Sequence, residues 1–472
     1  MNKTDQSAGA RPAHQTVAVA IQFQNANKSI QIEFTDQKLS PHAGTATFWS
    51  FLHGSGWIPL LEKCLPHPLP KSNNNLTPLC KGLGFIQGLL CGAKKLAQVA
   101  YLRRDPMVPE MVGIKRVASQ SVLTRFFQGF SSAGRNLSCF RRLFGWCLER
   151  LPSRPGGYAL DLDSTRLLHE DGHQQGVEVG YTRVGTKPCL HPLLGMLSEV
   201  RLVAGFWLRP GNSSCANNAT AFFLDLWDNL SSHIHLRVVR ADSGFCVGGL
   251  LVLWESLKLR FVVAARLLRP LQGLIKKETR WQATEIDGTE VAELDYHEKD
   301  WPATARLIVI RHRTQDKSGR SGGKLLIDCP GYLFQALVTN LPRTEKPLAV
   351  WREYNGRAAC ENIIKELDAG YGLPDLACKN FWATEAALSL GVLAHNLVVL
   401  FERKLGWLEA VTIGSLRYWL FVTAGVISHA QGKTTIKLAV REKERGWWQG
   451  LWEKLLSPFP NCNAVGNRPG TA

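Results

Sequence analysis

Two stretches of the sequence place acidic residues where a metal ion could be held. In "ALDLDST" (159–165), the alternation of a strand sets Asp161 and Asp163 on one face. In "RVVRADSGF" (237–245), an apolar strand leads directly into Asp242, at the strand end where open α/β sheets bind ligands. Hard divalent cations prefer such carboxylate ligands. A pair of these ions can activate a water or sugar hydroxyl on one side of a phosphorus atom and stabilise the leaving oxygen on the other.

A third stretch, "YNGRAACENIIKELDAGYG" (354–372), has the periodicity of one amphipathic helix with an exposed polar stripe. The stripe consists of Tyr354, Arg357, Glu361, Lys365 and Asp368. Glu361 supplies a third carboxylate beside the strand acids. Arg357 and Lys365 are expected to contact phosphates, and Tyr354 to hydrogen-bond to or stack on the same nucleic-acid strand. The three acids together predict a pair of Mg²⁺ ions, which Mn²⁺ can replace.

Two of these assignments have alternatives in the sequence itself. Asp242 stands before Ser243 and Gly244, so capping of the helix that follows would also explain it. Asp161 competes with Asp163 as the first acid, because both lie on the same strand face. Unpaired buried carboxylates are costly, which favours a functional role for this strand.

The chain is basic and has the composition of a globular protein. Over 472 residues, 56 Lys and Arg stand against 39 Asp and Glu, which gives a net charge of +17. This charge is spread along the chain and favours nucleic acid over a membrane as partner, although solubility alone would also account for it. Twelve scattered cysteines fit a reducing cytosol and predict neither a zinc site nor a disulfide framework. The most apolar run, 386–401, contains His395 and Asn396 and predicts a buried helix.

Changes of pattern along the chain predict an α/β protein of several parts. We expect a polar tail and β-hairpin (1–44), a mainly helical domain (45–150), a catalytic domain (151–403) with a β-rich insertion (about 268–345), and a basic C-terminal segment of strands and helix (404–472). In the helical domain, "VASQSVLTRFFQGF" offers Ser119 or Ser121 as the N-cap of a short helix that carries Arg125. This helix is a candidate for the second helix of a helix-turn-helix.

The catalytic part is expected to begin with three strands, a helix, a strand, a helix and a strand. The strands are predicted in "YALDLDSTRLL", "GVEVGYTRV", "MLSEVRLVAGFWL", "HLRVVRAD" and "RFVVAAR", and the helices at about 217–231 and 246–257. This order indicates an α/β sheet in which an antiparallel meander precedes parallel crossovers. After the β-rich insertion, helices return at about 346–368 and 382–403, and "YWLFVTAGVISHAQGKTTIKLAV" is strand-like.

With these motifs, the sequence resembles the DDE transposases of bacterial insertion sequences, in the branch marked by Tyr-x2-Arg-x3-Glu-x6-Lys. Tyr354, Arg357 and Glu361 match that spacing, "DST" (163–165) resembles the first acidic motif and "RADSGF" (240–245) the second. The stretches "GYTRVGTKPCLHPLLG", "RPGN" and "AHNL" also resemble family sequence. Three motifs in order are more specific than any one of them.

The resemblance implies a ribonuclease-H-like catalytic domain with a β-rich insertion between the second Asp and the Glu. It implies that Asp163, Asp242 and Glu361 are the catalytic metal ligands. Asp163 is chosen over Asp161 because the family's first acid stands two residues before a Thr, here Thr165. The N-terminal domain, Arg125 included, would bind the terminal inverted repeats of the element. The cleaved 3′-hydroxyl would then be joined to target DNA by a homodimer, in the cytoplasm and on the bacterial nucleoid.

One position departs from the signature. Its last residue is Lys, whereas Asp368 stands there in this chain and reverses the charge. Lys365, one turn after Glu361, is the expected substitute on the same stripe. Two alternatives follow: a catalytically silent descendant that still binds DNA, and a ribonuclease-H-like nuclease without strand transfer.

Overall fold

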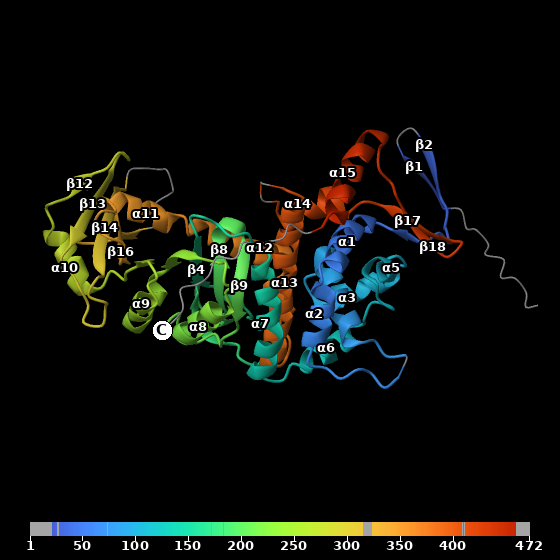
Figure 1. Ribbon diagram of the computed structural model, residues 1–472, viewed down its shortest axis with the longest axis horizontal. Helices are drawn as coiled ribbons and strands as arrows, with labels where there is room; N and C mark the ends of the chain where they lie inside the picture. The colour runs from blue at the N-terminus through green and yellow to red at the C-terminus, as the bar shows by residue number, and fades with distance from the viewer. Residues whose placement is uncertain are drawn as a thin grey trace, which may run out of the picture.

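A ten-stranded mixed sheet runs through one half of the molecule, and a bundle of helices forms the other half. The computed structural model describes residues 21–25, 28–72, 74–170, 172–182, 184–314, 323–407, 409 and 411–458. Figure 1 shows an elongated molecule, with the large sheet toward the left end of its long axis and the helices α1 to α7 toward the right.

Five strands form the centre of the sheet: β4 (Tyr158–Ser164), β8 (Leu193–Leu197), β9 (Leu202–Trp207), β10 (Leu236–Ala241) and β11 (Phe261–Ala264). The first three form an antiparallel meander, and β10 and then β11 follow parallel to β4. Helices α8 (Ala219–Asn229) and α9 (Gly248–Ser256) lead into β10 and β11. A meander followed by parallel strands is thus observed as predicted, but the strands that form the meander differ from the predicted ones.

Two of the expected strands are placed differently. The stretch at 196–208 is not one strand, because Arg201 adopts a left-handed φ of 57° after a short 3₁₀ turn and separates β8 from β9. The stretch at 176–184 lies outside the meander, since β6 (Glu178–Thr182), β7 (Gly185–Leu190) and β5 (Leu167–Leu168) form a sheet of their own. Val179 and Tyr181 of β6 are exposed, which a strand covered on both faces would not allow.

The strands predicted as an insertion continue the central sheet. After α10 (Arg269–Lys277) come β12 (Gln282–Ala283), β13 (Thr289–Leu294), β14 (Arg306–Arg313), β15 (Lys324–Leu325) and β16 (Tyr332–Thr339). β16 pairs antiparallel with β11 on one side and with β14 on the other, so one hydrogen-bonded ladder runs from β12 to β9. The division of the chain into domains stays a prediction.

Helices dominate the stretch before the sheet. They are α1 (Ala46–Gly54), α2 (Trp57–Cys64), α3 (Pro78–Leu90), α4 (Leu96–Tyr101), the 3₁₀ helix η2 (Leu102–Arg104), α5 (Val108–Val112), α6 (Gln120–Gln128) and α7 (Ala133–Glu149). The hydroxyl of Ser119 caps α6, which decides between the two expected caps. Before them, β1 (Ile21–Asn25) and β2 (Lys28–Ile32) form the predicted hairpin. The polar tail at 1–20 lies outside the described residues.

A single core helix, α13 (Phe381–Lys404), joins the two halves. It packs against β9 of the sheet and against α3, α6 and α7 of the helical half. By length and composition it could cross a membrane, but its most apolar 18-residue window is entirely buried inside the protein. The predicted buried helix is confirmed, and its apolar sequence follows from its central position.

The C-terminal part returns to the helical half. It contains α14 (Ile413–Leu416), a π-helical turn (Arg417–Phe421), β17 (Gly425–Ala430), β18 (Lys433–Leu438) and α15 (Arg445–Leu456), and β17 pairs with β3 (Leu39–Ser40). The prediction that this part begins as a strand at "YWLF" is wrong. Leu420 and Phe421 are both buried, and Phe421 packs on Phe48 and Phe401, so neighbouring side chains share a face that a strand would divide.

Candidate active site

Asp161, near the middle of β4, is fully buried and engaged by two partners. Arg240 lies opposite it on β10 and donates from Nε to Oδ1 at 2.7 Å and from Nη2 to Oδ2 at 2.8 Å. The hydroxyl of Ser198 donates to the same carboxylate. A bidentate arginine pair fixes the geometry of both partners. Asp161 therefore ties β4 to β10 and is a structural acid in this arrangement.

Asp163, two residues later on the same face, is 7% exposed and has a different arginine. Arg357 Nη2 lies 2.7 Å from Oδ2, and the backbone N–H of Ser164 donates to Oδ1 at 2.8 Å. Burial raises the pKa of Asp163, the charge of Arg357 lowers it, and the charge of Asp242 raises it further. Asp163 and Asp242 are therefore close enough to interact electrostatically.

Asp242 follows the last residue of β10, the parallel neighbour of β4, so both acids stand at the same edge of the sheet. Its Oδ1 accepts a hydrogen bond from the backbone N–H of Gly244 at 2.8 Å and caps the short turn Ser243–Phe245. The capping interpretation is thus observed. It leaves Oδ2 without a hydrogen bond within the described chain, so capping and ligand binding are compatible.

The single helix predicted at 354–372 is in fact two helices. α11 (Pro347–Asn355) and α12 (Ala358–Tyr371) are separated by a two-residue turn, Gly356 and Arg357, which we call the corner. A Cβ atom on Gly356 would lie 2.3 Å from Nη1 of Arg240. The glycine therefore allows the chain to pass directly over the arginine that holds Asp161.

The exposed polar stripe is wrong for its first two members, and its last member, Asp368, is also not exposed. Tyr354 is buried at the end of α11, against β-sheet residues that include Ala159 and Val238, and burial raises the pKa of its hydroxyl to about 12. Arg357 is 9% exposed and turns inward to Asp163. The helical periodicity does not reveal this, because it assumes one continuous helix axis.

Glu361 and Lys365 occupy the first two turns of α12. Glu361 stands one turn after Arg357, on the same side of the helix, and is partly exposed. Neither side chain makes a hydrogen bond or ion pair with another described residue, and Lys365 is exposed. Cys360, next to Glu361, contacts Oδ2 of Asp163 at 3.4 Å, so the first turn of α12 faces the strand acids.

Arg201, in the turn between β8 and β9, fixes the later part of α12. Its guanidinium donates to Glu366 of α12 at 2.7 Å and to Glu402 of α13 at 2.9 Å. Glu366 also accepts the backbone N–H of Ile413 at 2.8 Å. One half-buried arginine thus connects the sheet, both late helices and the segment before α14, and helps to set the direction in which α12 presents Glu361.

A further polar cluster next to Asp163 has no role predicted from the sequence. His191 Nε2 accepts from the hydroxyl of Ser164 at 2.8 Å while Nδ1 donates to the carbonyl of Ser213 at 2.7 Å. Ser164 also lies 3.2 Å from Sγ of Cys215. Arg209 donates to the carbonyl of His191, among others. These residues buttress the end of β4 from the stretches "KPCLHP" and "RPGN", which resemble family sequence and were the only signal available.

Asp368, at the signature position of the lysine, is largely buried on α12. Its Oδ1 has no hydrogen-bond partner within the described chain, and burial raises the pKa of its carboxyl to about 6. It therefore does not point a negative charge into solvent beside Lys365. Its Oδ1 is instead shielded from solvent without a partner, at a cost in stability.

The carboxylates do not form a complete metal site in this arrangement. Among the described residues, no group of three or more His, Cys, Asp or Glu side chains is placed to hold a metal ion. Asp163 is already neutralised by Arg357, and Asp242 is the only other predicted ligand shown to interact with it. The pair of Mg²⁺ ions therefore stays a prediction, for which this arrangement brings together Asp163 and Asp242.

The fold and the site together define a mixed α/β protein with a cluster of acids at the carboxyl ends of two parallel central strands. The family described as "Transposase DDE domain group 1" matches residues 23–455, so the chain belongs to this family. No curated protein sequence matches the chain significantly. Among solved structures, the chain is similar to a piggyBac transposase synaptic complex with hairpin DNA, at 10% identity and a TM-score of 0.43, over 93% of this chain and 90% of that one.

Loss of the Arg357 side chain should destabilise the protein through Asp163. Breaking a buried ion pair from one side costs about 3–5 kcal/mol, so we expect Arg357→Gln to lower the free energy of unfolding by about 3 kcal/mol in urea denaturation. The double variant Arg357→Gln/Asp163→Asn should recover part of this loss. Arg352→Gln, which removes an exposed pair with Glu285, is the control and should change stability by less than about 1 kcal/mol. Equal losses for both single variants would contradict the assignment.

Replacement of Asp368 should make the protein more stable in a pH-dependent way. The pKa of about 6 in the folded chain exceeds the ordinary value of about 3.9, so the penalty is absent below about pH 4 and complete above about pH 6. We expect Asp368→Asn to raise the free energy of unfolding by about 1–3 kcal/mol at pH 8 and by almost nothing at pH 4. The exposed Asp287→Asn is the control. A pH-independent effect of Asp368→Asn would refute the explanation.

Proposed function

We propose that this transposase cleaves DNA at the terminal inverted repeats of an insertion sequence and joins the freed 3′ ends to target DNA. Asp163, Asp242 and Glu361 are the proposed catalytic acids, with Mg²⁺, or Mn²⁺ in its place, as the cofactor. The observation that carries the proposal is the approach of Asp163 and Asp242 at the ends of parallel strands, in a chain that belongs to a DDE transposase family. Glu361 is supported by its place on the turn of α12 that faces them.

The arrangement of the central strands supports a ribonuclease-H-like catalytic domain. An antiparallel meander followed by two parallel strands puts the first acid on β4 and the second directly after β10. We also propose that the chain belongs to the branch marked by Tyr-x2-Arg-x3-Glu-x6-Lys. Tyr354, Arg357 and Glu361 have the spacing of that signature, and Asp368 stands where the signature has Lys. The bacterial setting and the nucleoid location belong to the same proposal.

The basic residues take different roles in this proposal. Lys365 is exposed one turn after Glu361 and is free to contact a phosphate, and Arg125 is exposed on α6. Arg357 first holds Asp163 and must release it before it can contact a DNA strand. Tyr354, being buried, requires a movement of α11 to reach the same strand. Two copies acting on two ends would explain synapsis, and a homodimer on double-stranded DNA is therefore part of the proposal.

A second candidate is a catalytically silent descendant that binds DNA without cleaving it. Two observations favour it: Arg357 neutralises Asp163, and the described carboxylates form no cluster of three. The positive charge of the chain would be retained in that case. Specific binding of the element's ends without nicking in any divalent metal would select this candidate. Cleaved ends that are never joined to target would instead select a nuclease without strand transfer.

The proposal is tested by cleavage of supercoiled DNA that carries the element's ends, with purified protein and Mg²⁺. We expect end cleavage by the unaltered chain and a loss of at least about 1,000-fold in Asp163→Asn, Asp242→Asn and Glu361→Gln, because each removes a ligand charge needed in the transition state. Asp287→Asn, an exposed acid far along the chain, should cleave normally. Cleavage that survives any of the three substitutions would remove that residue from the proposed triad.

A further inference from the structure

The helical half contains a cavity of about 610 Å³ whose charged residues are all positive. Its wall is formed by the loop before α3, by the first turn of α3, by η2, by the segment leading into α6 and by α6 itself. The side chains that line it include Lys81, Arg103, Arg116 and Arg125, together with His67 and Ser119. No Asp or Glu appears among the described residues around it. Such a concentration of like charge favours an anion as occupant.

The four cationic side chains form no ion pair with the described residues of the protein. Arg116 donates from Nη2 to the carbonyl of Asn74 at 2.7 Å, which leaves its other donors available. Lys81, Arg103 and Arg125 make no ion pair with a described residue. Burial lowers the pKa of Lys81, and the positive charge of Arg125 lowers it further. The two side chains are therefore close enough to repel each other. Cations that repel one another in this way are stabilised strongly when they bind the same anion.

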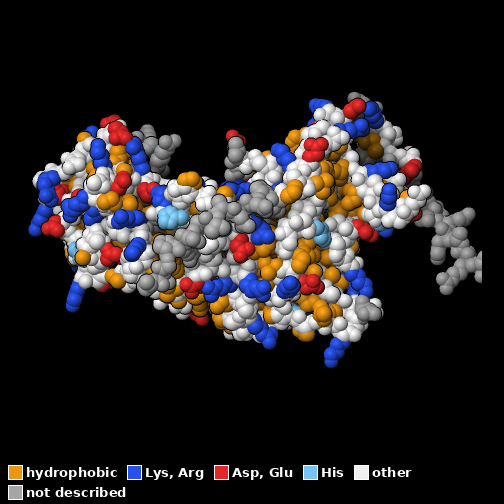
Figure 2. All heavy atoms as spheres, viewed as in Figure 1, with side chains coloured by type: hydrophobic (Ala, Val, Ile, Leu, Met, Phe, Trp, Pro, Cys, Tyr) orange, Lys and Arg blue, Asp and Glu red, His pale blue; other side chains and the backbone are white. Residues whose placement is uncertain are grey.

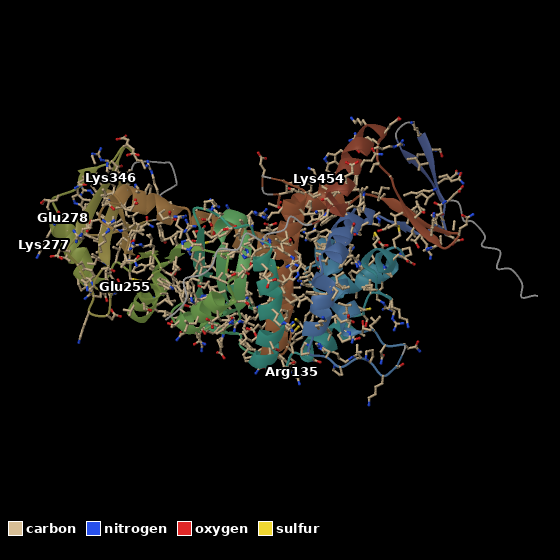
Figure 3. The ribbon with its side chains drawn as sticks, viewed as in Figure 1. Arg135, Glu255, Lys277, Glu278, Lys346 and Lys454 are labelled. Carbon is tan, nitrogen blue, oxygen red and sulfur yellow. The ribbon has the colours of Figure 1, made fainter. Side chains whose placement is uncertain are left out.

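One wall of the cavity is rigid. The ring of His67 stacks on Phe126 of α6 at 4.7 Å between centroids, and its Nε2 bonds the carbonyl of Phe126 at 2.7 Å. Its Nδ1 is buried and has no partner within the described chain. Arg135, labelled in Figure 3 at the foot of the helical half, adds a further positive charge beside His67 and donates to the carbonyl of Gly129 at 3.1 Å. The cavity is thus a preformed basic site.

The cavity is separate from the acidic edge of the sheet. It lies on α6, and α13 packs between α6 and β9. Lys and Arg side chains are also scattered over both halves of the face shown in Figure 2, so general attraction to a polyanion is expected everywhere. This site differs from the rest of the surface because four cationic side chains line one cavity. An oxygen-rich anion with several acceptors, such as a phosphate group, matches this donor set.

We propose that this cavity binds backbone phosphates of the DNA substrate and holds the DNA at a second point, away from the catalytic acids. The proposal rests on the proposed function for the nature of the substrate. A phosphate group could also come from a free nucleotide, and the experiment separates the two sources. Since contacts to phosphates carry no sequence information, the site should hold DNA of any sequence.

The test uses the full chain and a fluorescent duplex of arbitrary sequence, with affinity measured from 0.05 to 0.3 M salt. Arg103→Gln/Arg125→Gln should weaken binding about 30-fold at 0.15 M salt and reduce the salt slope by nearly two, because each phosphate contact contributes about 0.9 to the slope. Arg103→Lys/Arg125→Lys should keep most of the slope. The control is Arg269→Gln/Lys277→Gln, which removes two exposed cations of α10 at the other end of the molecule. It should leave slope and affinity nearly unchanged.

The outcomes are distinct. Equal losses in the pocket and control variants would mean general charge attraction and would overturn the proposal. So would an unchanged slope in the pocket variant. The proposal would also be overturned if the unaltered chain bound millimolar AMP or inorganic phosphate in the cavity while its affinity for DNA stayed the same, because the cavity would then hold a free phosphate and not the DNA. Thermal unfolding of each variant shows that it is folded. Failure of the catalytic proposal appears separately, as cleavage that does not depend on Asp163, Asp242 or Glu361 while the pocket variants still lose DNA.

Discussion

The structure depends on the cost of placing two carboxylates in one buried strand. Asp161 and Asp163 both lie on β4, and neither can remain charged in the interior without a partner. Each therefore recruits an arginine from a distant part of the chain: Arg240 from β10 and Arg357 from the corner between α11 and α12. These two pairs bring the parallel strand and the late helices to the same edge of the sheet. The candidate site is the consequence of this pairing.

The two arginines also explain why one acid is structural and the other is the better candidate for chemistry. Arg240 engages both oxygens of Asp161 from within the sheet, where a strand cannot move without breaking the ladder. Arg357 reaches Asp163 by one nitrogen from a helix corner, and its own Nε has no partner within the described chain. A single contact from a corner is easier to exchange for a cation or a phosphate than a bidentate pair inside a sheet.

Much of the fold could be predicted from the sequence, and the failures have physical causes. Period-two and helical patterns located β4, β10, α8, α9 and the buried helix α13, because burial imposes these patterns locally. The corner at Gly356 was missed, since the reason for it is the close approach of Arg240, 116 positions earlier in the chain. The burial of Tyr354 and Arg357 follows from that corner and was missed with it. The ion pairs and the cluster around His191 join residues that only the fold brings together, so no local pattern could reveal them.

The unbroken hydrogen-bond ladder from β9 to β12 has a mechanical consequence. A domain connected only by two loops could move independently of the central sheet. Here β16 pairs with β11, so the outer strands belong to the same twisted sheet. Bending β13 or β14 would strain β11 and, beside it, β10, which leads into Asp242. A displacement of the outer strands, from β12 to β16, would therefore twist the strands that carry Asp163 and lead into Asp242.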